Sequence, residues 1–86
     1  MISLKQAQGA LQCELDRVHQ DGEEIVIDFG IHENGHIGRG IRLSVSSLGL
    51  YRVECSTCAT TGTLFTLANA YKRATDFIAR FALVPA

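Results

Sequence analysis

The sequence predicts an α+β domain, of order α-β-β-β-α, in which two helices cover one face of a three-stranded antiparallel sheet. Apolar residues recur at helical spacing near both ends of the chain, and between these segments they alternate with polar residues. Two glycine-containing turns separate the alternating segments, which is typical of consecutive hairpins. A chain of 86 residues has room for one domain, residues 1–86.

The first helix is expected to begin after Ser3, because Ser3 followed by Gln6 is a capping-box pattern. Gly22 is expected to end this helix in a left-handed conformation. Gly9 inside the helix indicates either close backbone packing or a weak first half. The apolar face of the helix consists of Leu4, Ala7, Leu11, Leu15 and Val18.

Three strands are expected to follow, over about 23–31, 37–45 and 51–55, with their apolar side chains at odd positions. A three-residue loop over 33–35, with Gly35 left-handed, keeps those positions on one face of the first hairpin. This register pairs Ile31 with Ile37, Ile27 with Ile41, and Ile25 with Leu43. It also places Arg39 opposite Phe29 on the inner face, which predicts a bulge at the glycines beside Arg39.

The second hairpin is expected to have the same kind of three-residue loop, over 47–49, in which Gly49 takes the left-handed position. The resulting pairs are Val45 with Tyr51, Leu43 with Val53, and Ile41 with Cys55. Arg42 then faces Glu54 on an outer face that we expect to be solvated.

A long helix is expected from about Thr63 to Leu83, before Val84-Pro85 ends it. Its apolar arc of roughly 180° is wider than the stripe of about 100° that a surface helix needs. The arc is centred on Leu64, Leu67, Ala68, Tyr71, Ala74, Ile78, Phe81 and Ala82, with Ala70 and Phe77 at its margin. The surplus apolar surface predicts self-association through Phe65, Phe77, Phe81 and Leu83. The alternative is that the first helix covers this surplus.

Composition excludes several classes of function. Eight basic residues against nine acidic ones give no broad field that would attract nucleic acid or an anionic membrane. No segment has the length or hydrophobicity of a signal peptide or membrane span. Three cysteines form no even framework, so we expect free thiols and a cytoplasmic location.

The α-β-β-β-α order is similar to that of double-stranded-RNA-binding domains, in topology alone. Those domains grip phosphates with a lysine cluster at the start of the second helix. Here the first turns of that helix, residues 63–68, contain no basic residue. We therefore expect no nucleic acid among the partners.

Two arrangements of histidine and cysteine suggest an alternative function. In the predicted first hairpin, His32 and His36 are cross-strand neighbours with Cys58 about one residue row away, and together with Glu33 they could hold zinc. Cys55 and Cys58 form a Cys-x-x-Cys motif, but Cys55 points inward and Cys58 outward if the strand continues through both. Side chains that flank turns are more often simply exposed.

No set of nucleophile, base and orienting group is evident, and His19 and Asp28 are titratable residues with no predicted common pocket. We therefore expect a non-enzymatic, self-associating interaction module that forms a homodimer or binds another protein through its sheet face. No cofactor is expected. A zinc- or thiol-dependent protein that uses His32, His36 and Cys58, or Cys55 and Cys58, is the alternative.

Overall fold

The computed structural model describes residues 2–14, 16–30, 40–55 and 64–86, and for Cys55 and residues 64–67 it describes the backbone only. The class is α+β, as predicted, but the order is α-β-β-β-β-α-β, so the predicted topology, and with it the similarity to double-stranded-RNA-binding domains, is wrong. The elements are α1 (Leu4–Ala10), β1 (Arg17–Asp21), β2 (Glu24–Phe29), β3 (Ile41–Val45), β4 (Leu50–Cys55), α2 (Leu64–Arg80) and β5 (Val84–Pro85).

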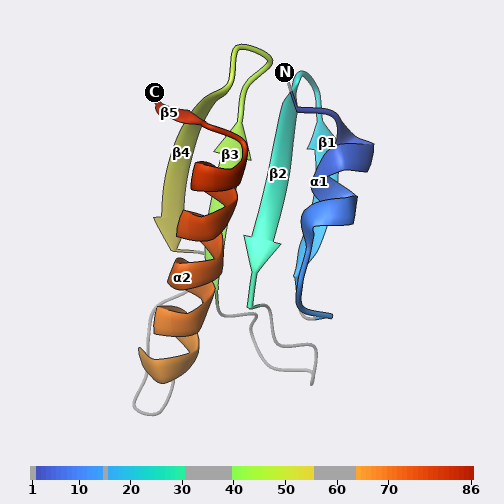
Figure 1. Cartoon of the computed structure of the whole chain (residues 1–86). Helices are drawn as coiled ribbons and strands as arrows, with labels where there is room; N and C mark the ends of the chain where they lie inside the picture. Colours follow the sequence, from blue (N-terminus) through green and yellow to red (C-terminus); the bar gives the residue numbers. More distant parts are fainter. Residues whose placement is uncertain (1, 15, 31–39, 56–63) are drawn as a thin grey trace.

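The five strands form one sheet in the order β1-β2-β3-β4-β5 (Figure 1). All neighbours are antiparallel except β4 and β5, which are parallel. Both helices cover the same face, because their buried residues belong to one core with the odd-numbered residues of β2 and β3. That core contains Ala7, Ala10, Ile25, Ile27, Phe29, Ile41, Leu43, Val45, Ala70, Ala74 and Phe77.

The predicted first helix is too long, because α1 ends at Ala10 and the chain then forms β1. The capping box at its start is confirmed: Ser3 Oγ accepts from the Gln6 amide at 3.1 Å, and Gln6 Oε1 accepts from the Ser3 amide at 2.8 Å. Gly22 is left-handed as expected (φ 61°), but it turns a hairpin from Asp21 to Glu24. Pairing of five residues with β2 stabilises a strand here more than the few apolar residues at helical spacing after Leu11 would stabilise a helix.

Gly9 does lie within α1, but a side chain at this position would meet nothing within 4 Å. Close packing therefore does not explain this glycine, and it weakens the helix instead.

The register between β2 and β3 is displaced by two residues from the prediction. Ile27 pairs with Leu43 and Phe29 with Ile41, so the inner and outer faces are correct but the partners are not. A shift of two residues preserves the alternation, which is why the hydrophobic pattern alone could not detect it. Residues 33–35 and Arg39 lie outside the described residues. Gly40 is buried so close to β2 that an added Cβ would lie 1.9 Å from the Phe29 carbonyl oxygen.

The hairpin between β3 and β4 is confirmed at every predicted pair. Gly49 is left-handed at φ 80°, and its amide donates to the Ser46 carbonyl at 3.0 Å. Arg42 faces Glu54 across the outer face.

The outer face of the sheet is less solvated than predicted, since Val26, Asp28 and Ser44 are buried there. Long side chains of the neighbouring strands flank them: Ser44 pairs with Arg52, and Arg42 Nε donates to Asp28 Oδ1 at 2.7 Å. Such side chains cover apolar surface with their stems while the charged ends stay in water. β2 and β3 are therefore covered on both faces, although only one face of the sheet carries helices.

The buried face of α2 is rotated from the predicted one. Ala70, Ala74 and Phe77 are buried, whereas Tyr71 is 59% exposed. Alanines at spacing i, i+4 let the helix lie close to the sheet, so the side on which they lie faces inward.

Among the described residues, no helix is long and apolar enough to cross a membrane.

The end of α2 leads directly into β5, which the sequence pattern did not predict. The Leu83 amide donates to the Ile78 carbonyl and the Ala82 amide to that of Ala79, which is the Schellman arrangement. Ala82 takes the left-handed position that glycine normally occupies (φ 50°). Val84 then pairs with Leu50 in β4.

The left-handed alanine predicts a stabilising substitution. Ala82→Gly should raise the free energy of unfolding by about 0.5–1 kcal/mol, because relief of the left-handed strain exceeds the extra entropy of a glycine in the unfolded chain. Urea denaturation followed by circular dichroism measures it. Ala79→Gly, inside the helix, is the control and should destabilise by a similar amount. A lower stability for Ala82→Gly would contradict this account of the helix end.

Candidate functional site

A groove lies at the end of the sheet where the β3–β4 turn, the end of α2 and the start of α1 meet. It has a volume of about 300 Å³. Its walls are formed by Ile2, Gln6, Leu48, Gly49, Phe81, Ala82, Leu83 and Val84. Gln6 is the single polar side chain among them, but polar atoms of Gln6 and of the backbone make up almost half of the exposed lining, so the groove is mixed in character.

Three local features of the sequence build this groove. The left-handed Gly49 turns the chain from β3 into β4 and brings Leu48 to the tip. The Schellman end of α2 leads Leu83 and Val84 to the outer edge of β4, where Val84 pairs with Leu50. A hydrogen bond of 3.0 Å from the Val84 amide to the Gly49 carbonyl then joins these two walls.

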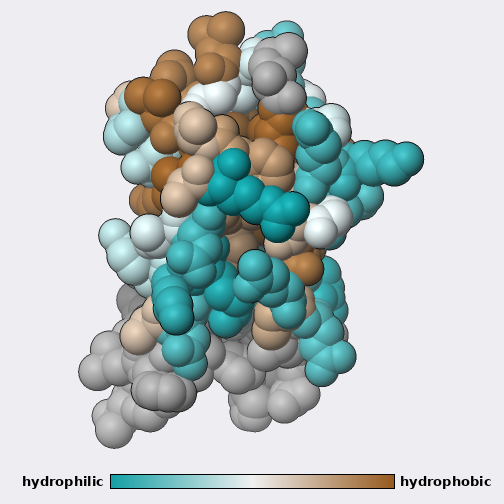
Figure 2. Space-filling view, in the orientation of Figure 1, coloured by the Kyte–Doolittle hydropathy of each residue, from teal (hydrophilic) through white to brown (hydrophobic). Residues whose placement is uncertain are grey.

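Exposed apolar side chains are concentrated at this end of the molecule. Leu48 is 80% exposed and Val84 55% exposed, and Leu50 beside them is also exposed. Figure 2 shows apolar surface gathered where the β3–β4 turn and the C-terminal residues lie. A contiguous apolar surface of this kind on a folded domain marks an interaction site more often than chance exposure does.

The predicted interface residues have different positions in the structure. Phe81 and Leu83 line the groove and are half-buried against the core. Phe77 is 4% exposed, and its ring lies edge-on to Phe29 with centroids 6.0 Å apart, so in the isolated chain it belongs to the core. The side chain of Phe65 lies outside the described residues.

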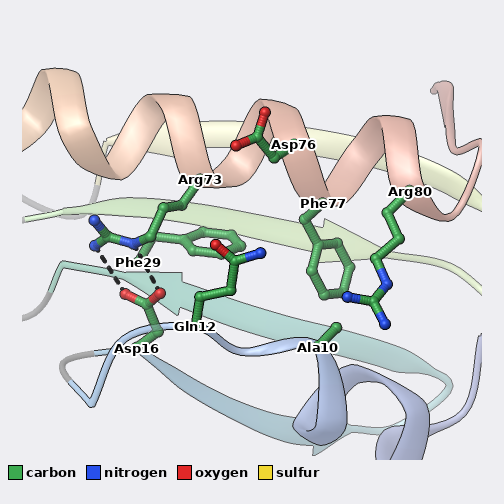
Figure 3. Close-up of a pocket in the computed structure, with 8 residues that line it drawn as sticks. All are labelled: Ala10, Gln12, Asp16, Phe29, Arg73, Asp76, Phe77 and Arg80. Atoms are coloured by element: carbon green, nitrogen blue, oxygen red, sulfur yellow. Dashed lines mark hydrogen bonds and ion pairs between the residues drawn. The ribbon is translucent and has the colours of Figure 1, made fainter.

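A second, polar site joins α2 to the beginning of β1 (Figure 3). Arg73 Nε donates to Asp16 Oδ2 at 2.9 Å, and Arg73 Nη2 donates to Asp16 Oδ1 at 3.0 Å. The Gly30 amide donates to the same Oδ1 at 2.9 Å. The Asp16 side chain is 1% exposed, and its hydrogen bond with Arg73 raises the pKa of that guanidinium.

The cavity beside this ion pair is too small for a ligand. It encloses about 30 Å³, which is room for about a single water molecule. Gln12, Asp76 and Arg80 lie around its rim (Figure 3). We interpret the pair of Asp16 and Arg73 as a structural tie between α2 and the sheet.

Of the residues in the predicted metal and thiol sites, the structure describes only the backbone of Cys55, which pairs with Ile41 at the end of β4. His32, Glu33, His36 and Cys58 lie outside the described residues, as does the side chain of Cys55. In the described ranges, no three His, Cys, Asp or Glu residues are grouped as a metal site requires. The zinc hypothesis stays a prediction.

His19 and Asp28, the titratable residues for which the sequence predicts no common pocket, both lie on the outer face of the sheet. His19 pairs with Val26, and Asp28 is two residues further along β2. The carboxylate of Asp28 is bonded to Arg42, and this hydrogen bond raises the pKa of the Arg42 guanidinium. Asp28 and Arg42 therefore form an ion pair, which we interpret as structural.

Sequence reasoning missed Leu48, Ile2 and Val84 as members of the groove. Leu48 carried one usable signal, because a leucine occupies a turn position where polar residues predominate. Ile2 and Val84 carried none, since their proximity depends on the unpredicted β5.

Comparisons with models of protein families, with curated proteins and with solved structures find no match to this chain.

The buried ion pair should contribute strongly to stability. Asp16→Asn removes the charge opposite a half-buried guanidinium, and it should lower the free energy of unfolding by about 3 kcal/mol. Glu24→Gln is the matched control, because it neutralises the exposed partner of Arg52 and should cost at most about 1 kcal/mol. Urea denaturation midpoints measure both. Equal effects would show that Asp16 does not tie α2 to the sheet.

Proposed function

We propose that this chain is a non-enzymatic interaction module that forms a homodimer through the groove between the β3–β4 turn and the end of α2. The observation that carries the proposal is the exposure of Leu48 beside a groove that it also lines. A domain of 86 residues buries only about 60–65% of the surface of its unfolded chain, so a partner that covers further apolar surface adds needed stability.

The groove suits a second copy because it carries a projection and a recess side by side. In a two-fold symmetric contact, each surface meets the same surface of its partner. Leu48 of each subunit can then enter the recess between Phe81 and Leu83 of the other. An apolar space of about 150 Å³ accommodates a ring the size of benzene, so a groove of about 300 Å³ has room for a leucine side chain.

The substitution Leu48→Asp tests this proposal. Two leucines leave the contact, each with about 1.5–3 kcal/mol of burial, so the dissociation constant should rise about 100-fold or more. Sedimentation equilibrium over a range of concentrations measures the change. Tyr71→Asp is the matched control, because Tyr71 is an exposed apolar residue of α2 outside the groove.

Two results would contradict the proposal: a wild-type chain that stays monomeric at every concentration, or a Leu48→Asp variant that associates like the wild type. Circular dichroism of the variant ensures that a loss of folding is not read as a loss of association. Native mass spectrometry of protein purified without chelator adds a separate reading. One zinc ion per chain would support the alternative function based on His32, His36 and Cys58.

A further inference from the structure

The outer edge of β1 is open along the part of the chain that the structure describes, since β1 is the first strand of the sheet and pairs only with β2. A turn of two residues separates Asp21 from Glu24, and the pair that closes such a turn is hydrogen-bonded. Alternation then directs the backbone groups of Arg17, His19 and Asp21 to β2. Those of Val18 and Gln20 point away from the sheet.

The backbone on either side of this open segment already has partners. The Asp16 amide donates to the Cys13 carbonyl at 3.0 Å, and the Asp16 carbonyl accepts from Arg17 Nη1 at 3.1 Å. The Gly22 carbonyl accepts from Gln20 Nε2 at 3.1 Å. Among the described residues, nothing bonds the outward amides and carbonyls of Val18 and Gln20. Four polar groups in a row are thus available to another strand.

We propose that β1 of a second copy of this chain pairs with this edge, antiparallel and two-fold symmetric about His19. In this register, Val18 faces Gln20 of the partner subunit and Gln20 faces the partner's Val18, so all four open groups bond to open groups. A register centred on Val18 would direct Gln20 to Asp16 of the partner subunit, and one centred on Gln20 would direct Val18 to the partner's Gly22. Both alternatives would leave open groups of Val18 or Gln20 without a hydrogen-bond partner, because the backbone groups of Asp16 and Gly22 that they would face are already bonded.

Charge favours the same register. Arg17 and Asp21 lie on the outer face at the two ends of β1 and are both exposed. Symmetry about His19 places Arg17 opposite Asp21 of the partner subunit at each end, and opposite charges at directly paired positions stabilise a sheet. The contact is therefore self-complementary in charge as well as in hydrogen bonds.

The new pairs continue a pattern within the subunit. The ladder registers place Arg17, Asp28, Arg42 and Glu54 in one row across four strands, so the sign of charge alternates along the row. Asp21 of the partner subunit extends this row beyond Arg17 with the expected sign. The second copy thus extends an existing charge pattern, and the two sheets become one.

This contact is separate from the groove of the proposed function, so each can fail without the other. If both operate, every subunit touches two others, and the wild type is larger than a dimer. Leu48→Asp should then leave a dimer joined through β1. A variant at the edge should leave a dimer joined through the groove, and a chain with both changes should be a monomer.

A reciprocal charge exchange tests the edge itself, and it is made in chains that also carry Leu48→Asp. Asp21→Arg gives β1 a positive charge at both ends, and Arg17→Asp gives it a negative charge at both ends. Each variant alone should associate about tenfold more weakly than the Leu48→Asp chain, because two attractive pairs become repulsive. A mixture of the two should regain association as a one-to-one complex, since every facing pair is again opposite in charge.

Gln20→Pro gives an independent reading, because it removes an outward amide that β2 does not use. It should abolish association at the edge while the circular dichroism spectrum is retained. In the Leu48→Asp chain, hydrogen exchange at the Val18 and Gln20 amides should slow as the protein concentration rises. A mixture that does not associate, or exchange at these amides that is independent of concentration, would overturn the proposal. The groove would be unaffected by either result.

Discussion

The buried carboxylate of Asp16 holds together three segments that are distant in the sequence. It accepts from Arg73 of α2 through both oxygens and from the amide of Gly30 after β2, and it directly precedes β1. A charge this deeply buried requires such partners, because their loss leaves an unpaired ion in a medium of low dielectric constant. The position of α2 over the sheet, and with it the position of the groove at the far end of α2, depends on this contact.

The sequence predicts the fold well where local turn chemistry and hydrophobic period agree, and poorly where only one of them is available. Gly49 fixed the length of the β3–β4 loop, so every pair of that hairpin could be predicted. The β2–β3 pairs could not, because a shift of two residues leaves the same side chains on the same face. The sequence pattern predicts helix where β1 lies, because Val18 is at helical spacing from the apolar residues before it. The pairing of β1 with β2 is a tertiary effect that local propensity does not contain.

The candidate site was predictable only in part, for a related reason. Phe81 and Leu83 could be identified from the width of the apolar arc, since this requires only the sequence of one helix. The recess itself needs a left-handed residue after α2 and a fifth strand. Alanine at position 82 gives no sequence signal for such a turn, because glycine is the residue that usually marks it. The sequence pattern places Phe77 at the margin of the apolar arc and in the interface, because the pattern does not contain the rotation of the helix about its axis, which Ala70 and Ala74 set by their small size.

The short strand β5 gives the groove a dynamic character. β5 pairs with β4 over only two residues, and the hydrogen bonds from Val84 to Gly49 and from Ala86 to Tyr51 lie at the ends of this short ladder, directly after the strained Ala82. An element held by so few bonds opens at a much lower free energy than the rest of the sheet. Because Val84 is both part of β5 and a wall of the groove, opening of this strand removes the site. Under the proposed function, a partner in the groove would bind only when β5 is paired, so occupancy of the groove and order at this edge of the molecule would rise together.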